Sequence, residues 1–124
     1  MSDPVNGRRQ YRSGKRFEDR TGLHLTENGY FTVRAGGSRG VADLVAVKPG
    51  QVLLVQCKTD GKLPPGPWNA LYDAAAACGA VPVLAERPGR RRLAYWRLTA
   101  RKDARGPQPR EVFLVDEVTE ASRG

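Results

Sequence analysis

Three polar residues interrupt two apolar segments near the middle of this chain. Asp43 is the first polar residue in 41–47, a segment that otherwise predicts a buried strand. A lone carboxylate there would be costly unless something paired with it, and a divalent cation is one such partner. Gln56 and Lys58 follow the second apolar segment, where strand alternation places them on one face and Cys57 on the other. Converging groups of these types are those that metal-assisted phosphodiester chemistry uses.

These groups converge only if the neighbouring elements bring the two segments together. Residues 48–51 contain Pro49 and Gly50 and predict the turn of a β-hairpin. The segment 60–67 holds several Gly and Pro residues and predicts a loop that lies over the site. Elsewhere the pattern predicts helices at 15–28 and 68–78, strands at 30–34, 81–85 and 93–98, and a short added strand or dimer-docking segment at 111–118.

The chain divides by composition into three parts. Residues 1–13 carry Gly, Asn, Ser and several arginines without periodicity, so we expect a flexible basic arm. Residues 14–100 form the predicted core, and 101–124 are a polar linker with a C-terminal segment. A chain of 124 residues is enough for one domain.

The charge balance favours a nucleic-acid partner. Lys and Arg outnumber Asp and Glu by 21 to 13, which gives a formal net charge of +8. Ribosomal-type binders and membrane-surface proteins share such a balance, but no stretch here is long and apolar enough to span a bilayer. The start of the chain lacks the apolar centre of a signal peptide, so we expect a cytoplasmic protein. Cys57 and Cys78 are then expected to be reduced thiols packed in the core.

A series of motifs follows the same order as in a known family of nucleases. The series is Gly14-x-x-x-Glu18, the strand at 30–34, Gly37-Ser38, Asp43, Gln56-x-Lys58, an Ala-rich helix, and the apolar strand at 81–85. It resembles the archaeal-type Holliday junction resolvases, members of the restriction-endonuclease-like PD-(D/E)XK superfamily. The resemblance covers roughly residues 14–98. It implies an α/β fold with a mixed central β-sheet flanked by helices, and a homodimer that cuts four-way junctions and related branched DNA.

The resemblance also implies a set of metal ligands. Glu18 is the helix-borne acid, Asp43 the central ligand, and the main-chain carbonyl of Cys57 a further ligand of Mg²⁺. Gln56 stands where most relatives have an acid, so the site has one negative charge fewer. A Gln oxygen can still bind a hard cation, although more weakly, and Mn²⁺ is a possible substitute.

The remaining implied site residues contact DNA. Lys58 is the basic residue of the motif, and Ser38 and Arg34 resemble polar positions around the scissile phosphate. With only nine aromatic residues in the chain, we expect recognition through duplex shape and phosphates rather than base stacking. The basic residues expected to follow the DNA backbone are Arg8, Arg9, Lys15, Arg16, Arg34 and Arg39.

Each of these residues also has an ordinary structural interpretation. Glu18 and Lys58 could hold their charges in water, Asp43 could cap a turn, and Ser38 could serve only the Gly-rich turn. The basic clusters could be solvated surfaces. The alternative function is accordingly a non-catalytic basic protein that binds DNA junctions on the same fold. A restriction-type endonuclease is disfavoured because the chain has no room for a sequence-recognition domain. The richness in Ala, Arg, Gly and Pro suggests a bacterial or phage source.

Overall fold

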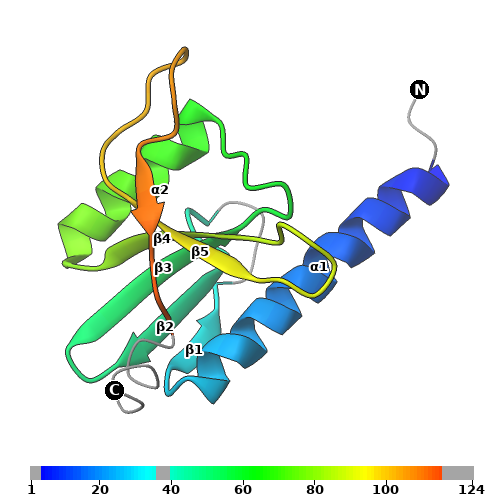
Figure 1. The fold of residues 1–124 in the computed structure, drawn as a ribbon, viewed down its shortest axis with the longest axis horizontal. Coiled ribbons are helices and arrows are strands. Elements are labelled where there is room, and N and C mark those ends of the chain that lie inside the picture. Colours follow the sequence, from blue (N-terminus) through cyan, green and yellow to red (C-terminus); the bar gives the residue numbers. More distant parts are fainter. Residues whose placement is uncertain (1–3, 36–39, 116–124) are drawn as a thin grey trace.

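A mixed six-stranded sheet lies between two helices (Figure 1). The computed structural model describes residues 4–35 and 40–115, with the backbone alone for 4–13. All neighbouring strands are antiparallel except β3 and β4, which are parallel and joined through α2. The elements in chain order are α1 (Pro4–Glu27), β1 (Phe31–Arg34), β2 (Leu44–Lys48), β3 (Gln51–Cys57), α2 (Pro65–Cys78), β4 (Val81–Glu86), β5 (Ala94–Leu98) and β6 (Arg110–Val112). The predicted α/β architecture is confirmed.

Strand alternation divides the apolar side chains between two cores, one on each face of the sheet. The core beside α1 includes Phe17 and Leu25 of that helix together with Leu53 and Val55 of β3. The core beside α2 includes Trp68 and Leu71 of that helix, with Leu84 and Leu98 from the sheet. Each helix therefore buries one apolar side against one sheet face, which fixes its rotation about its own axis.

The predicted hairpin forms between β2 and β3, with Lys48 paired to Gln51 across the turn. Asp43 lies immediately before β2 rather than inside it. Its backbone nevertheless continues the sheet pairing, since its amide donates to the Val55 carbonyl at 2.8 Å. The carboxylate is thus placed at one end of the strand pair, where the apolar cores stop.

The first helix is longer than predicted. The expected start near Lys15 is wrong, because the backbone is helical from Pro4, and the expected flexible arm at 1–13 is therefore helical over 4–13. Figure 1 shows this half of α1 projecting beyond the sheet. A nucleated helix extends at low cost, since each added residue gains one hydrogen bond. Without a sheet to cover, this half needs no apolar periodicity, so the sequence carried no signal for it.

The second helix also begins earlier than predicted. It starts at Pro65, not at Trp68, and includes Gly66 and Pro67 in its first turn. Proline is tolerated there because the first amides of a helix have no intrahelical acceptor. The helix ends as expected at Gly79, whose φ of 69° is left-handed. Cys78, expected in the core, is exposed, because it is the last residue of α2 and lies beyond the buried Ala75.

The later strands agree with the sequence pattern. β4 and β5 occupy the predicted segments. β6 confirms the short added strand expected at 111–118, although it begins one residue earlier, at Arg110, and ends at Val112. The part of that segment after residue 115 lies outside the described residues. Within the described part of the chain, no helix has both the length and the hydropathy needed to cross a membrane.

Candidate active site

The first carboxylate is placed by the buried side of α1. Phe17, Thr21 and Leu25 form the predicted stripe and are at most 3% exposed. Thr21 satisfies its buried hydroxyl by donating to the Phe17 carbonyl at 2.7 Å. Because this stripe fixes the rotation of α1, the adjacent Glu18 faces the end of the β2–β3 pair rather than open water.

The second carboxylate is held by main-chain hydrogen bonds. The amide of Cys57 donates to Oδ2 of Asp43 at 2.8 Å. The backbone of Asp43 is held on both sides, since its amide bonds to Val55 and its carbonyl accepts from the Ala35 amide at 3.0 Å. Asp43 therefore does not cap a helix or a turn. It is a rigidly oriented acid between two strands.

These acids line one hollow together with the polar end of β3. The hollow has a volume of about 640 Å³. The residues around it are Gly14, Phe17, Glu18, Asp43, Gln56, Cys57, Lys58, Thr59 and Asp60. Glu18, Asp43, Gln56 and Lys58, which are far apart in the sequence, thus meet in one place. Their individual roles stay predictions.

Burial and the nearby Asp43 make Glu18 harder to ionise. Burial raises the pKa of Glu18 above its ordinary value, and the negative charge of Asp43 raises it further. The cations of Arg34 and Lys15 act in the opposite direction but do not cancel the rise. Two carboxylates facing each other with a net unfavourable field are the arrangement that a divalent cation relieves.

Arg34, at the end of β1, pairs with acids of α1, and its role at the scissile phosphate stays a prediction. Its guanidinium pairs with Asp19 and lies 3.8 Å from Oε2 of Glu18. These contacts connect β1 to α1 at the rim of the hollow. Because the side chain is 40% exposed, the pairs contribute little to stability, and the guanidinium stays accessible to a phosphate.

Cys57 lies behind the acids, on the core side of β3. It packs against the core beside α1, as predicted. Burial, and then the negative charge of Asp43, raise the pKa of its thiol to about 12. The thiol is therefore neutral at physiological pH, so the contribution of Cys57 to the hollow comes from its backbone.

The donors in the hollow suit a hard cation. Mg²⁺ prefers oxygen ligands at about 2.0 to 2.1 Å and keeps several waters. Glu18, Asp43, the Gln56 amide and the Cys57 carbonyl are all oxygen donors at this end of the sheet. No group of three or more His, Cys, Asp and Glu side chains that could hold a metal ion occurs in the described ranges.

The loop after Lys58 is held by contacts that the sequence did not reveal. Gly61 has a φ of 69°, and any Cβ at this position would lie 2.0 Å from Oε2 of Glu86. Glu86 is fixed in turn because its other oxygen accepts from Nε1 of Trp96 at 2.6 Å. Glycine is therefore required three residues after Lys58, where the chain turns away from the hollow.

The C-terminal segment fastens the same loop from outside. Gln108 donates to the Gly61 carbonyl at 3.0 Å and accepts from the Leu63 amide at 3.1 Å. Arg110 donates to the Gly61 carbonyl at 3.3 Å, and its guanidinium stacks over the Trp96 ring. The role of 101–124 was unassigned from the sequence, because side chains that serve loop backbone leave no periodic pattern.

Several predicted contact residues cannot be placed at the hollow. Ser38 and Arg39 lie outside the described residues, as do the side chains of Arg8 and Arg9. Lys15 and Arg16 are exposed on α1, next to the hollow-lining Gly14. The described side chains of the predicted DNA surface are therefore Lys15 and Arg16 of α1 and Arg34 of β1.

Comparisons with known proteins point to one family. Residues 9–121 match the family described as archaeal Holliday junction resolvase (Hjc). A segment of 55 residues is 42% identical to the crossover junction endodeoxyribonuclease Hjc of Methanocaldococcus jannaschii, covering 44% of this chain and 41% of that protein. The match thus spans less than half of the relative's length.

A solved structure has the same fold. Hjc of Archaeoglobus fulgidus, a Holliday junction resolvase from an archaeal hyperthermophile, superposes with a TM-score of 0.59 at 24% identity. The match covers 68% of this chain and 76% of that one. Both relatives are archaeal, so they give no support to the bacterial or phage source expected from composition. With the family match extending over nearly the whole sequence, the chain belongs to the archaeal Holliday junction resolvase (Hjc) family.

Proposed function

We propose that this chain is a metal-dependent endonuclease that cuts four-way junctions and related branched DNA. The observation that carries the proposal is the pair of facing carboxylates, Glu18 and Asp43, with Gln56 and Lys58 around the same hollow. A net charge of +8 draws a polyanion toward the protein, yet this hollow presents carboxylates. A cation between the acids and a phosphate reconciles the two.

Mg²⁺ is the proposed cofactor, with Mn²⁺ as a substitute. Asp43, Glu18, the Gln56 side-chain oxygen and the Cys57 carbonyl would hold it. When bound, the cation lowers the pKa of water and offsets charge on the phosphate. Gln56 leaves the site one charge short of three acids, so we expect weaker metal binding than three carboxylates would give.

The protein groups then have distinct tasks in hydrolysis. Water forms a new P–O bond as the bond to the leaving sugar oxygen breaks, while the water loses a proton and the leaving oxygen gains one. Asp43 is fixed by the Cys57 amide and does not need to reorganise. Lys58 orients the water or offsets negative charge that develops on the phosphate.

The proposed assembly is a homodimer. Resolution of a four-way junction requires two opposed cuts, and the described part of the chain has one hollow of this composition. Two copies related by a two-fold axis would supply both sites. Light scattering of the protein alone and with one junction tests this assembly.

The test is cleavage of a labelled four-way junction beside linear duplex of the same sequence. The arms are Mg²⁺, Mn²⁺ and EDTA, with wild type and Asp43→Ala. We expect paired nicks in the junction alone, abolished by EDTA and by the substitution. Cleavage of both DNAs alike would leave a general nuclease, and cleavage that persists in Asp43→Ala would contradict the assigned site.

One observation favours a second candidate, a junction-binding protein without activity. Only two acids line the metal side of the hollow besides Asp60 of the following loop, and Gln56 is uncharged. If the metal affinity is too low, the basic surface would still bind DNA. Tight junction binding without cleavage in either metal would identify this alternative.

A further inference from the structure

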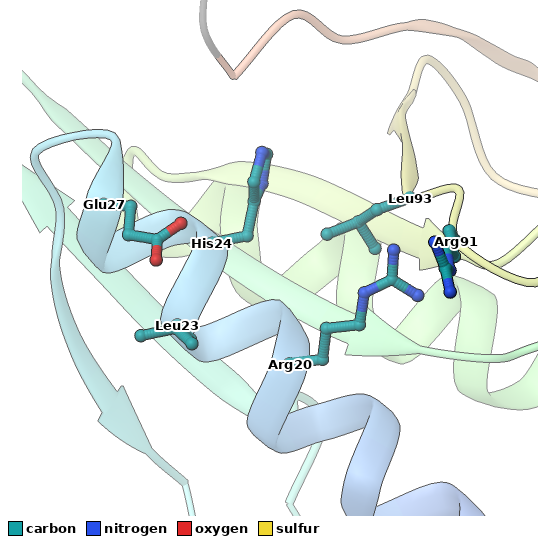
Figure 2. Close-up of a pocket in the computed structure, with 6 residues that line it drawn as sticks. All are labelled: Arg20, Leu23, His24, Glu27, Arg91 and Leu93. Carbon is teal, nitrogen blue, oxygen red and sulfur yellow. The ribbon is translucent and has the colours of Figure 1, made fainter.

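A second hollow lies on the other side of α1, between that helix and the segment that enters β5 (Figure 2). Its volume is about 450 Å³. The residues around it are Arg20, Leu23, His24, Glu27, Arg91 and Leu93. The two arginines come from elements far apart in the sequence, and no predicted function included Arg20.

The charges in this hollow are arranged for an anion. Figure 2 shows Arg20 extending from α1 toward Arg91 and Leu93, whereas Glu27 lies at the far end beyond His24. Within the described part of the chain, neither arginine forms an ion pair with a carboxylate. Two guanidinium groups that line one hollow and form no ion pair have donors available for the oxygens of a bound phosphate.

The histidine of the hollow already has a partner. Nδ1 of His24 lies 2.9 Å from the Tyr95 hydroxyl, and the two rings stack at 5.7 Å. This contact positions the histidine against β5 and holds α1 at this distance from the sheet. The opening between Arg20 and Arg91 is therefore set by packing and not by the arginines themselves.

The two elements that line this hollow, α1 and the loop 87–93, also contact the candidate active site. On one side, α1 lines the first hollow with Gly14 and Glu18 and the second with Arg20. On the other side, the loop 87–93 starts where the Arg87 amide donates to the carbonyl of Thr59, a residue of the first hollow, at 3.2 Å. The same loop carries four arginines and no acid. This arginine-rich loop thus runs from the first hollow to the second.

We propose that Arg20 and Arg91 form a second phosphate site that holds the backbone of a DNA arm whose scissile phosphate lies at the carboxylate hollow. The inference rests on the proposed function, since it extends that substrate beyond the cut bond. Two separated phosphate contacts on one rigid surface fix the direction in which a duplex leaves the active site. The site therefore orients the substrate and takes no part in bond cleavage.

The test measures binding in EDTA, where no cleavage occurs. Arg20→Gln/Arg91→Gln is compared with Arg101→Gln/Arg105→Gln, which removes the same charge. The control arginines lie in a segment that Figure 1 places beside α2, away from the packed half of α1, and Arg101 pairs there with Asp73. Circular dichroism verifies that each variant is folded.

Affinity for the junction is titrated from 50 to 200 mM salt. Loss of two phosphate contacts makes the negative slope of log K against log salt shallower by about 1.8. The ratio of wild-type to variant affinity therefore falls about tenfold between 50 and 200 mM salt. We expect this change for Arg20→Gln/Arg91→Gln alone.

The outcomes separate the inference from the function beneath it. Equal slopes for the two double variants, with junction binding by wild type intact, would overturn the second phosphate site and leave the nuclease proposal standing. Wild-type binding without any cleavage in Mg²⁺ or Mn²⁺, but with the expected slope change, would support the site and refute the nuclease. Absence of wild-type binding to any DNA would overturn both.

Discussion

The two hollows beside α1 differ in the sign of the charges that they bring together. In one, Glu18 and Asp43 face each other across the end of the β2–β3 pair. In the other, Arg20 and Arg91 line the space between α1 and the segment that enters β5. Each arrangement suits a partner of opposite sign, a cation in the first and a phosphate in the second. A single helix carries one member of each pair, so its packing sets both sites at once.

The hollows also differ in how firmly their charges are held. Asp43 is fixed by a main-chain amide, and the loop after Lys58 is fastened by Gln108 and Arg110. Arg20 and Arg91 have no such partners within the described residues and can adapt to a phosphate. Rigid groups suit the chemical step, whereas adaptable ones suit recognition of a polymer that bends.

After Asp43→Ala, the largest expected effect comes from removing the ammonium group in the first hollow. Lys58→Met retains the aliphatic stem but removes the charge, so we expect the single-turnover cleavage rate to fall by about 10² to 10³. Junction affinity should change little, because the tighter phosphate contacts lie elsewhere. Rapid-quench kinetics beside binding in EDTA measures both, and a parallel loss of affinity would show that Lys58 binds rather than catalyses.

A second variant increases the charge difference between the hollows. Gln56→Glu adds a third carboxylate, and metal affinity rises with the number of charged ligands. We expect the Mg²⁺ concentration for half-maximal cleavage to fall by about tenfold. The control is Gln56→Ala, which should require more Mg²⁺ than wild type. Unchanged metal dependence in both variants would place Gln56 outside the ligand set.

A third measurement uses the raised pKa of Glu18. The unfolded group titrates near 4.5 and the folded group higher, so ionisation favours the unfolded state as pH rises between them. Below pH 4.5 the acid is protonated in both states and does not change the free energy of unfolding. Above the folded pKa its ionisation lowers the free energy of unfolding. In EDTA, Glu18→Gln should raise the unfolding temperature at pH 7 and leave it unchanged at pH 4, whereas Mg²⁺ should reverse the order at pH 7.

The matched control for this pH effect is Asp19→Asn. It removes a neighbouring exposed acid that pairs with the same arginine but does not line the carboxylate hollow. Its unfolding temperature should stay close to that of wild type at both pH values, because a surface ion pair contributes little to stability. Similar behaviour of the two variants would mean that Arg34, not the facing acids, controls the result.

The smallest expected effect comes from removing the hydrogen bonds that Gln108 makes to the loop after Lys58. Gln108→Ala removes both hydrogen bonds to Gly61 and Leu63, which costs on the order of 1 kcal/mol per bond in stability. We expect a fall in cleavage rate of about tenfold at unchanged junction affinity. Gln108→Glu keeps only the acceptor and should restore activity in part at most. Wild-type rates in Gln108→Ala would show that the loop is held sufficiently without it.

Much of the fold was readable from local pattern. The hairpin turn at Pro49–Gly50, the alternation along β3 and the stripe of Phe17, Thr21 and Leu25 each repeat at the spacing of their element. The starts of α1 and α2 were not readable. One extends past the sheet without needing an apolar side, and the other begins with prolines that only the first helical turn tolerates.

The candidate site could be predicted only in part, because only some of its residues stand out from their local pattern. Asp43, Gln56 and Lys58 were visible because polar residues stand out in apolar strands. Gln108 and Arg110 were not, since a polar residue in a polar segment carries no contrast. Arg20 and Arg91 look like two of many basic residues until the packing of His24 against Tyr95 places them around one hollow.

The sequence by itself determined which segments are strands and helices, which side of each is apolar, and which polar residues could do chemistry, because these properties follow from neighbours within a few residues. The tertiary structure alone decided that Glu18 faces Asp43, that the C-terminal segment holds the loop after Lys58, and that Arg20 and Arg91 line one hollow. Such contacts join residues far apart in the chain, and only packing of the helices on the sheet sets their distances.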